Sequence, residues 1–567
     1  MNRLSLSVVI LTKNEAEHIR QCLESVAWAD ERLVIDDEST DNTVALAESL
    51  GAKVLRRRMD NEGAHRNWAY AQAKHLWVLS LDADERVTPE LAEEIRGCLQ
   101  SEPPWNGAII PIQNHLGTHW LRYGGWYPAE KLRLFRKDRF RYEETLVHPR
   151  AFMPWPEGRL KGNIIHLGYR DFTECFEKLN RHTTFEARKW VSDGRRASLA
   201  EAMRKTLDRF LRAWIRKQGW REGFIGFMMA FYQGWYQWLT YLKYWELTHS
   251  QPAGGEGYRE TGVSMAGAGT VSRADARDER WPESRASGAT LGRSEASGRL
   301  GTPTSAGGRQ APVSVVILAK NEAAQLPDCI ETVRWAKEIL VIDDESTDDT
   351  VALAESLGAR VLRRRMDNEG RHRNWAYAQA SQPWVLSLDA DERVTPALQD
   401  EIVAAVTNNP KWNGYEIPRK TFIGSRWVRH GGWYPSAQLK LFRKDRFRYE
   451  EAEVHPKADV QEGWGSLHEP LWHYSYRDIE DFFATVNRQT SLEATKWHRQ
   501  GRRMSLAHAL WRTGDRKIRA FFLKGGFRDG MLGLTVASFA AFYQLASFAK
   551  YRELSHDKNA PAAAVHG

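Results

Sequence analysis

The chain contains the same sequence twice. Residues 34–41 (Val-Ile-Asp-Asp-Glu-Ser-Thr-Asp) recur as residues 341–348, and residues 80–86 (Ser-Leu-Asp-Ala-Asp-Glu-Arg) recur as residues 387–393. The offset is 307 residues in both cases, and it holds without a gap across almost all of residues 1–250. This period is far longer than the ~20–50 residues of solenoid repeats. Each repeat should therefore fold as a domain with its own core.

The repeat and the composition together predict the domain organisation. We expect a first domain in residues 1–250, with one half at about 1–105, a second half at about 106–195 and helices at about 196–250, then a linker at 251–311 and a second such domain at 312–567. The segment 251–311 is rich in Gly, Ser, Ala, Arg and Glu and has almost no large apolar residues, which predicts a disordered linker.

Charge and cysteine content narrow the class of protein. The net charge is +8 and the pI is about 9.1, which favours an anionic partner such as a nucleic acid, a membrane surface or a phosphate-bearing substrate, or reflects a generally basic proteome. No zinc-type cysteine spacing or RNA-binding signature is present, so we expect no nucleic-acid partner. The four cysteines form no Cys-x-x-Cys motif, which fits a reducing cytoplasm. The apolar run at the start recurs inside the chain and is too short for a signal peptide.

Strands and helices alternate in the first hundred residues of each repeat. Short β-branched runs predict strands at 7–12, 33–35, 53–55 and 77–81, and apolar spacing predicts helices at 15–28, 39–50, 62–73 and from Pro89 onward. Ser39 or Thr40 would cap the second helix. This alternation is typical of parallel β-α units, whose ligands gather beyond the carboxyl ends of the strands.

The end of each repeat is basic and then apolar. Residues 200–222 resemble a basic amphipathic helix, and residues 223–242, with their counterpart 530–549, carry no charge. Their length approaches the ~20 residues that span a bilayer. We expect these segments to lie in or dip into a membrane interface, with a true span and a soluble core helix as the alternatives.

The acidic pair Asp82 and Asp84, repeated as Asp389 and Asp391, follows a predicted strand. In an extended segment residues i and i+2 point the same way, so the two carboxylates could share a hard cation such as Mg²⁺ or Mn²⁺. Such a cation neutralises a departing diphosphate. The alternative is an ordinary acidic turn.

A second pair of carboxylates follows the predicted strand at 33–35. Asp36 and Asp37, repeated as Asp343 and Asp344, could accept hydrogen bonds from a nucleobase N–H or from ribose hydroxyls, or could belong to a helix-capping loop. Because both acidic motifs follow strands of one predicted parallel sheet, together they predict a nucleotide-diphosphate site.

The motifs resemble those of family 2 glycosyltransferases, which have a GT-A fold and invert the anomeric centre. The resemblance rests on residues 8–15, 34–43, 66–67 and 79–86, and residues 125–128, 132–136, 146–148, 166–171 and 178–181 resemble the lipopolysaccharide-core β-1,4-glucosyltransferase subgroup. It implies an α/β chain of two Rossmann-like GT-A domains in tandem, each with a C-terminal amphipathic or hydrophobic helical segment.

The resemblance also implies roles for the acidic and basic residues. Asp36 would bind the uridine, and Asp82 and Asp84 would hold ribose and metal. Arg66, with Arg373 as its counterpart, could approach the pyrophosphate, although a solvated helical arginine is equally consistent with the sequence.

An inverting transfer needs a base that deprotonates the acceptor hydroxyl. We choose Glu144 and Glu451, with the adjacent Glu143 and Glu450 as alternatives. The subgroup often has an acid directly after Val-His, where both repeats of this chain have proline. His148 and His455 could orient the base or the acceptor, or could be structural.

Acceptor contacts are predicted from aromatic and basic residues downstream. Trp126 and Trp433 could stack on a sugar, or could be core aromatics. Arg133 and its counterpart Lys440 could meet an acceptor phosphate, or could belong to a solvated basic loop.

The repeats differ unevenly along their length. Across residues 34–89 they differ at six positions, whereas from about residue 99 onward they differ much more. We therefore expect one shared donor and two different acceptors. The resemblance implies that the half at about 1–105 binds the donor, a UDP-hexose such as UDP-glucose, and that the half at about 106–195 binds the acceptor. It also implies lipopolysaccharide-core or lipid-linked glycan acceptors, membrane-associating helices at about 196–250 and a place at the cytoplasmic face of an anionic inner membrane. Alternatives are one active repeat with one binding or scaffold repeat, transfer to polyprenyl phosphate or polysaccharide, and a phosphatase with an Asp-x-Asp nucleophile.

Overall fold

A computed structural model describes residues 4–145, 149–249, 311–408, 410–451 and 457–556. Its residues form two compact units. The first comprises residues 1–250, 418–438 and 470–567, and the second comprises residues 251–417 and 439–469. The helices that follow the second repeat's sheet thus belong to the same unit as the first repeat. All but the last residue of the predicted linker 251–311 lies outside the described residues.

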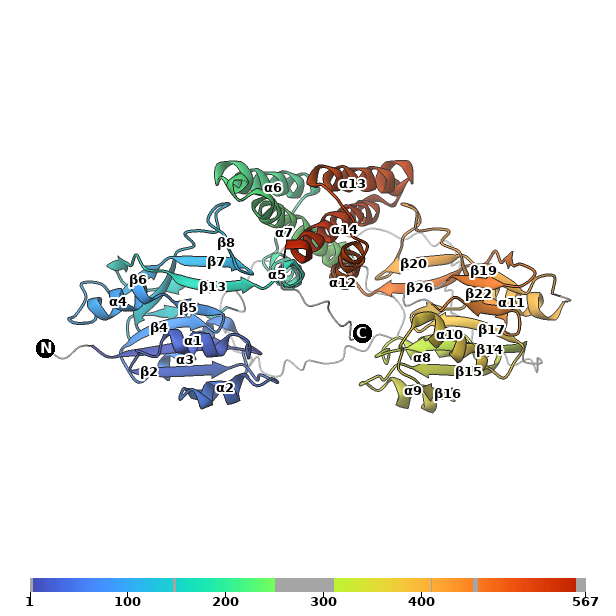
Figure 1. Ribbon diagram of the computed structural model, residues 1–567, viewed down its shortest axis with the longest axis horizontal. Coiled ribbons are helices and arrows are strands. Elements are labelled where there is room, and N and C mark those ends of the chain that lie inside the picture. Colours follow the sequence, from blue (N-terminus) through green and yellow to red (C-terminus); the bar gives the residue numbers. More distant parts are fainter. Residues whose placement is uncertain (1–3, 146–148, 250–310, 409, 452–456, 557–567) are drawn as a thin grey trace, which may run out of the picture. The chain divides into compact units, whose positions relative to one another are not determined.

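The first unit contains a seven-stranded sheet (Figure 1). Its order is β12 (Glu157–Arg159), β6 (Gly107–Ile110), β9 (Lys131–Arg136), β4 (Trp77–Asp82), β1 (Leu6–Thr12), β2 (Glu31–Asp36) and β3 (Lys53–Arg56). Strands β4, β1, β2 and β3 are parallel, as predicted, and β9 joins β4 antiparallel. The carboxyl ends of β2 and β4 therefore meet at one edge of the sheet.

Helices cover both faces of this sheet, which is why its central strands are nearly continuous apolar runs. The helices are α1 (Ile19–Ser25), α2 (Thr43–Ser49), α3 (Glu62–Ala71) and α4 (Pro89–Cys98). Val8 packs in one core with Leu23 of α1, and Val9 packs in the other with Tyr70 of α3. Helix α4 begins at Pro89, as predicted, and the Thr88 side chain caps it by accepting from the Leu91 N–H.

One predicted cap is wrong. Helix α2 begins at Thr43 and its N-cap residue makes no side-chain capping bond. Ser39 instead accepts from the backbone N–H of Asn14, and Asp41 accepts from the N–H of Thr43 at 3.0 Å. These short polar side chains hold the loop ahead of the helix.

A smaller sheet carries the second half of the repeat. Its order is β5 (Glu85–Val87), β13 (Ile164–Tyr169), β7 (Ile112–Leu116) and β8 (His119–Trp120), and a separate pair joins β10 (Arg141–Tyr142) to β11 (Ala151–Phe152). Because β5 follows β4 after a two-residue turn, β13 is brought beside the acidic motif.

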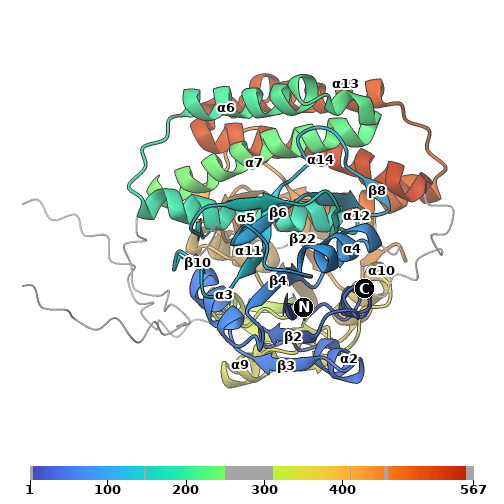
Figure 2. The same cartoon turned by 90° about the vertical axis from the view of Figure 1, so that its left-hand side faces the viewer.

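Six long helices complete the first unit. They are α5 (Phe172–Ser192), α6 (Leu199–Leu211) and α7 (Gly223–His249), and from the second repeat α12 (Ile479–Arg499), α13 (Leu506–Ile518) and α14 (Gly530–His556). A π-helical turn and a 3₁₀ turn precede α7 (Arg212–Arg216, Gly219–Glu222) and α14 (Arg519–Leu523, Gly526–Asp529). Strands β20 (Arg419–Ile423), β21 (Arg426–Trp427) and β26 (Leu471–Tyr476) also belong here. Figure 2 shows α6 and α13 as the outer layer of this bundle, with α7 and α14 beneath them.

The apolar segments predicted for a membrane interface are core helices of this bundle. Leu239 and Leu242 of α7 and Phe542 of α14 are at most 1% exposed. Within the described residues one helix, Gly526–Ser555, is long and apolar enough to cross a bilayer, and 78% of its apolar stretch is buried by protein. Hydropathy alone does not distinguish burial against lipid from burial against other helices.

The second unit contains an equivalent seven-stranded sheet. Its order is β16 (Arg360–Arg363), β15 (Ala336–Asp343), β14 (Ala311–Ala319), β17 (Trp384–Asp389), β22 (Gln438–Arg443), β19 (Gly414–Ile417) and β25 (Gly465–Ser466). Its helices are α8 (Leu326–Glu331), α9 (Thr350–Ser356), α10 (Glu369–Ala378) and α11 (Pro396–Thr407), and its short strands are β18 (Glu392–Arg393), β23 (Phe447–Tyr449) and β24 (Ala458–Val460).

Candidate active site

Asp36 ends β2 with a buried carboxylate that is only half satisfied. Its side chain is inaccessible to solvent. Oδ2 accepts from the Ser39 N–H at 3.0 Å, whereas Oδ1 has no hydrogen-bond partner among the described residues. Asp37 is fully engaged, since it accepts from the Met59 N–H at 2.7 Å and from Lys13 Nζ at 2.9 Å. A buried acceptor without a partner is rare in proteins, so Asp36 is a candidate ligand-binding group.

The corresponding carboxylate of the second unit lines a cavity. Asp343 accepts from the Ser346 N–H at 3.2 Å, and its neighbour Asp344 accepts from Lys320 Nζ at 3.0 Å. The cavity measures about 320 Å³, near the lower limit of ~300 Å³ for small-molecule sites. Its walls are Asp343, Glu345, Ser346, Arg363, Arg364 and Arg365. A carboxylate beside three guanidinium groups can bind a nucleoside that carries phosphate.

Asp82, at the end of β4, is held by two arginines. Its Oδ2 lies 2.9 Å from Arg133 Nη2, and its Oδ1 lies 3.4 Å from Arg66 Nη2. Burial opposes ionisation, but the charges of Arg133 and Arg66 outweigh it and hold the pKa of Asp82 well below its usual range. Arg373 lies 3.9 Å from Asp389 in the second unit.

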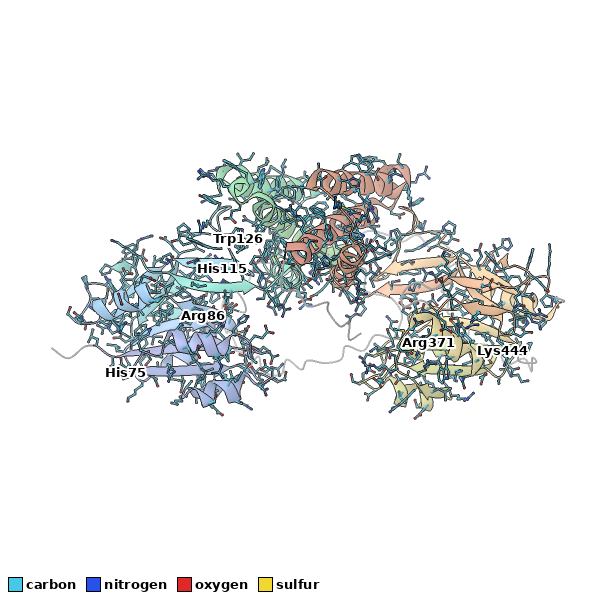
Figure 3. The ribbon with its side chains drawn as sticks, in the orientation of Figure 1. His75, Arg86, His115, Trp126, Arg371 and Lys444 are labelled. Atoms are coloured by element: carbon cyan, nitrogen blue, oxygen red, sulfur yellow. The ribbon has the colours of Figure 1, made fainter. Side chains whose placement is uncertain are left out.

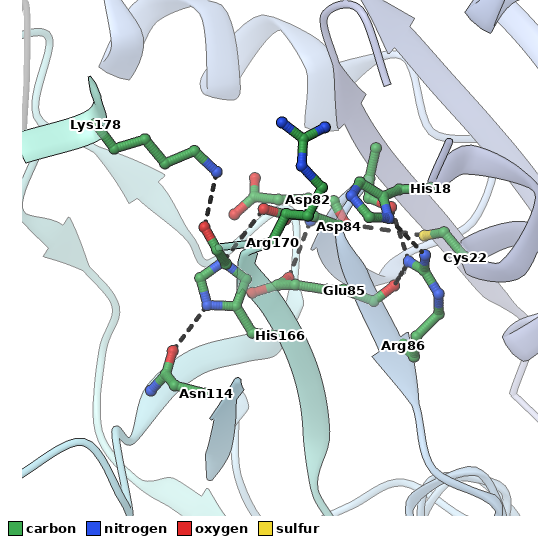
Figure 4. Close-up of polar contacts among 12 residues, drawn as sticks. His18, Cys22, Asp82, Asp84, Glu85, Arg86, Asn114, His166, Arg170 and Lys178 are labelled. Atoms are coloured by element: carbon green, nitrogen blue, oxygen red, sulfur yellow. Dashed lines mark hydrogen bonds and ion pairs between the residues drawn. The ribbon is translucent and has the colours of Figure 1, made fainter. Parts of the chain in front are cut away.

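Ala83 and Asp84 form a turn, so the extended geometry expected for the acidic pair is wrong. The two carboxylates have different partners. Asp84 Oδ2 lies 3.3 Å from His166 Nε2, and His166 Nδ1 lies 2.8 Å from Asn114 Oδ1 (Figure 4). Burial lowers the pKa of His166, but the hydrogen bond and charge of Asp84 outweigh burial and raise it.

His166, Asn114 and Glu15 were not predicted as site residues. His166 comes from β13 and Asn114 from β7, far along the chain from Asp84. Burial, followed by the negative charge of Asp84, raises the pKa of Glu15 to about 7. The sequence signal for His166 was the motif at residues 166–171, which carried the resemblance without a role for its histidine.

Arg133 and Lys440, which were predicted to contact an acceptor phosphate, are buried inside the protein. They are 3% and 4% exposed. Arg133 Nη2 lies 2.5 Å from Glu85 Oε1, in addition to its contact with Asp82. Lys440 Nζ lies 3.0 Å from Asp389 and 2.8 Å from Glu392. Both cations therefore neutralise the acidic motif from inside the protein and do not face solvent as a basic loop.

A divalent cation fits part of this site. The described residues contain no group of three or more His, Cys, Asp or Glu side chains placed to share a metal ion. Asp84, in the turn after β4, and His166, on β13, nevertheless supply one carboxylate and one imidazole, a donor pair that suits first-row metals such as Mn²⁺. Asp82 is committed to its arginines, so Asp84 is the better ligand of the two.

The candidate bases follow β10. Glu144 is exposed, and Glu143 is partly buried. Their backbone packs against the start of α3, where a Cβ at Gly63 would lie 1.8 Å from the carbonyl oxygen of Glu143. Only glycine fits this contact, which holds both glutamates beside the helix that carries Arg66.

Glu451 has partners that Glu144 lacks in the described region. It lies 3.5 Å from Arg371 and 3.1 Å from Arg448. Position 64, the counterpart of Arg371, is alanine. The predicted acceptor residues His148 and His455 lie outside the described residues.

Trp126 and Trp433 pack into the aromatic core. Trp126 lies 6.1 Å from Tyr169 and 5.9 Å from Tyr232, between ring centroids, and Figure 3 shows it beside the helical bundle. Trp433 lies 5.9 Å from Phe482. This placement agrees better with the alternative prediction, that both tryptophans are core aromatics, than with the prediction that they stack on a sugar.

Two mixed sheets, each with carboxylates at the carboxyl ends of its parallel strands, define a tandem GT-A architecture. The sequence profile of "Glycosyl transferase family 2" matches residues 7–153 and 314–459, together just over half of the chain. The chain belongs to glycosyl transferase family 2 and is a glycosyltransferase with two such domains.

Relatives match one repeat at a time. An uncharacterized glycosyltransferase of Rickettsia bellii is 28% identical over 256 residues, which cover 43% of this chain and 87% of the relative. The lipopolysaccharide core biosynthesis glycosyltransferase LpsC of Rhizobium meliloti is 25% identical over 246 residues, which cover 42% of this chain and 91% of the relative.

Solved structures resemble this chain only weakly. TarS of S. aureus (residues 1–349) is 17% identical, with a TM-score of 0.24 and coverage of 43% of this chain and 80% of that one. Glucosyl-3-phosphoglycerate synthase of Mycobacterium tuberculosis, with Mn²⁺, UDP and phosphoglyceric acid, is 20% identical, with a TM-score of 0.24 and coverage of 34% and 80%.

Proposed function

We propose that each repeat transfers a hexose, glucose by resemblance, from a UDP-sugar to a lipopolysaccharide-core or lipid-linked glycan, with inversion and with Mg²⁺ or Mn²⁺. The observation that carries the donor assignment is the buried, half-satisfied carboxylate of Asp36. Its unpartnered Oδ1 is an acceptor for the N–H of a uracil ring. The arginine-lined cavity at Asp343 supports the same assignment in the second repeat.

The acidic motif would bind the cation that neutralises the diphosphate. Arg66 and Arg133 fix Asp82, and Asp84 and His166 would hold the cation, which supplies positive charge for the departing UDP. Arg66, whose side chain is 16% exposed, would also approach a phosphate of the donor. Asp82 and Asp37 would serve ribose and loop geometry.

Glu144 and Glu451 are the proposed bases. Each would take the proton of the acceptor hydroxyl as its oxygen attacks C1 and the bond from C1 to UDP breaks. The fixed contact at Gly63 supports Glu143 and Glu144 as neighbours of the donor site. Because Glu451 is paired with Arg371 and Glu144 has alanine at that position, the two sites would differ in acceptor handling.

Divergence beyond the donor half supports two different acceptors. Asn114, which holds His166 in the first repeat, is replaced by Thr421 in the second. His473, the counterpart of His166, contacts Ser475 Oγ at 2.8 Å, where the first repeat has glycine. The histidine thus has a different neighbour in each repeat, beside an unchanged donor motif.

We further propose that the outer helices bind an anionic membrane on its cytoplasmic side. Apolar side chains of α6, α13 and the turns after them are exposed, among them Leu207 at 58%, Trp511 at 64% and Leu523 at 75%. Exposed basic residues accompany them, namely Arg204, Arg212, Arg216, Lys217, Arg221, Arg516, Lys517, Arg519, Lys524 and Arg528. Apolar groups flanked by Lys and Arg are typical of interfacial helices, and each basic group near anionic lipid contributes about 1 kcal/mol.

The test disables one site at a time in the full chain. Asp84→Asn and its matched counterpart Asp391→Asn are assayed for UDP release and for the mass of the glycan made on membranes from a strain lacking the chain. We expect each variant to stop the product short of two added hexoses, at different stages, and the double variant to release no UDP above background. A complete two-hexose product from either single variant would refute the sequential proposal. Loss of both steps in one variant and none in the other would support one active repeat with one binding repeat.

A further inference from the structure

The long helices of the two repeats contact each other reciprocally. Asn180 Nδ2 of α5 donates to the Glu480 carbonyl at 2.9 Å, and Asn487 Nδ2 of α12 donates to the Thr173 carbonyl at 3.0 Å. The 307-residue offset relates Asn180 to Asn487 and Thr173 to Glu480. The two hydrogen bonds are therefore one contact made in both directions, which is the defining property of an isologous two-fold interface.

A second reciprocal pair lies at the helix starts. The Glu246 carboxylate of α7 accepts from the Ile479 N–H at 3.0 Å, and the Glu553 carboxylate of α14 accepts from the Phe172 N–H at 3.2 Å. These residues also correspond at an offset of 307. Each glutamate thus satisfies an unpaired N–H at the positive end of the other repeat's helix.

A buried lysine orients the side-chain amide of each asparagine toward the other repeat. Lys243 Nζ lies 2.7 Å from Asn180 Oδ1, and Lys550 Nζ lies 2.6 Å from Asn487 Oδ1. Both lysines are 3% exposed. Because the lysine occupies the amide oxygen, the amide nitrogen points toward the other repeat. The donor is therefore oriented by residues of its own repeat.

Apolar packing surrounds these polar contacts. Ring centroids lie 4.9 Å apart for Phe176 and Phe542, 5.1 Å for Trp235 and Phe542, and 5.5 Å for Phe224 and Phe548. Buried residues of both repeats form one hydrophobic core. A repeat without its partner would expose a large apolar face, and such faces mark association surfaces.

We infer that the helical face of each repeat is self-complementary, so that the partner of one repeat is a second copy of that repeat. The two repeats of this chain should therefore stay associated through this face even when the chain between them is cut. The relatives described above have the length of one repeat, since 42–43% of this chain covers 87–91% of theirs. The assembly is independent of the proposed donor and acceptors.

The experiment uses the full chain with a protease site inserted between residues 251 and 310. After cleavage, sedimentation at low micromolar concentration should show one species with the 65.1 kDa mass of the uncleaved chain. Two half-mass species with intact circular dichroism would overturn the inference. Replacing Asn180 and Asn487 by leucine should weaken association of the cleaved halves at least tenfold, whereas the exposed Arg181→Gln on α5 should not change it.

A cross-link provides a measurement that does not depend on affinity. Thr173 Oγ1 and Ser491 Oγ lie 3.2 Å apart across the two repeats. In a Thr173→Cys/Ser491→Cys chain, cleaved first and oxidised afterwards, a non-reducing gel should show a band of full mass. Absence of that band, with both halves folded, would also contradict the inference.

Discussion

Arg133 provides the sharpest test of how the acidic motif is held. Arg133 is 3% exposed, and its guanidinium is shared by Asp82 at 2.9 Å and Glu85 at 2.5 Å. Glu85 is itself 1% exposed. Replacement of Arg133 by methionine keeps much of the volume but leaves two carboxylates beside an apolar side chain.

The expected loss follows from breaking a buried ion pair. Removing one partner of such a pair costs about 3–5 kcal/mol, because the remaining charge is buried without compensation. Arg66 still contacts Asp82 at 3.4 Å, so Glu85 bears most of the loss. Burial raises the pKa of Glu85, and removal of the Arg133 charge should raise it further, so the loss of stability should grow as pH rises.

The chain supplies its own control. Arg133→Lys reproduces the second repeat, where Lys440 Nζ lies 3.0 Å from Asp389 and 2.8 Å from Glu392, and should cost no more than about 1 kcal/mol. Urea unfolding followed by circular dichroism measures each free energy. Addition of Glu85→Gln should recover part of the loss in Arg133→Met. An Arg133→Met chain within about 1 kcal/mol of wild type would refute the account of the motif.

Three further predictions concern other parts of the chain. Gly63→Ala should lower UDP release by the first repeat at least tenfold, because its Cβ would lie 1.8 Å from the Glu143 carbonyl oxygen; unchanged release in an Asp391→Asn background would contradict this. Burial raises the pKa of Glu246 to about 7, so its stabilising effect is present below pH 4.5 and lost as pH rises through 7. The free energy of unfolding should therefore fall by at most about 3 kcal/mol over this range, and Glu246→Gln should flatten the pH profile. Leu523→Glu should reduce flotation with anionic liposomes and leave UDP release in solution unchanged; equal flotation would argue against the outer helices as the membrane contact.

Local pattern predicted the sheet well. The apolar runs at 7–12, 33–35 and 77–81 are the central strands, because a strand covered on both faces is apolar at nearly every position. The acidic motifs were placed correctly at strand ends for the same reason. The start of α2 was predicted wrongly, because Ser39 and Asp41 can either cap a helix or hydrogen-bond within a loop. Ser39 bonds to the loop that contains Asn14, a contact that the local sequence does not reveal.

Partners that come from distant strands could not be predicted. His166 meets Asp84 because β13 pairs with β5, a pairing that no local pattern encodes. Burial of Arg133 depends likewise on the place of β9 between β6 and β4. The apolar helices were misassigned to the membrane interface because their partner, the other repeat's helices, lies some 300 residues away.

The reciprocal contact between α5 and α12 has a consequence for how the two sites can change. In a dimer of identical chains every substitution appears twice, so both sites must keep the same specificity. In this chain one gene encodes both halves of the pair, so a substitution can change one site alone. Arg371 of the second repeat, for example, stands where the first repeat has Ala64. Fusion of the two repeats therefore keeps the contact between the helices symmetric while it allows the two active sites to differ in sequence.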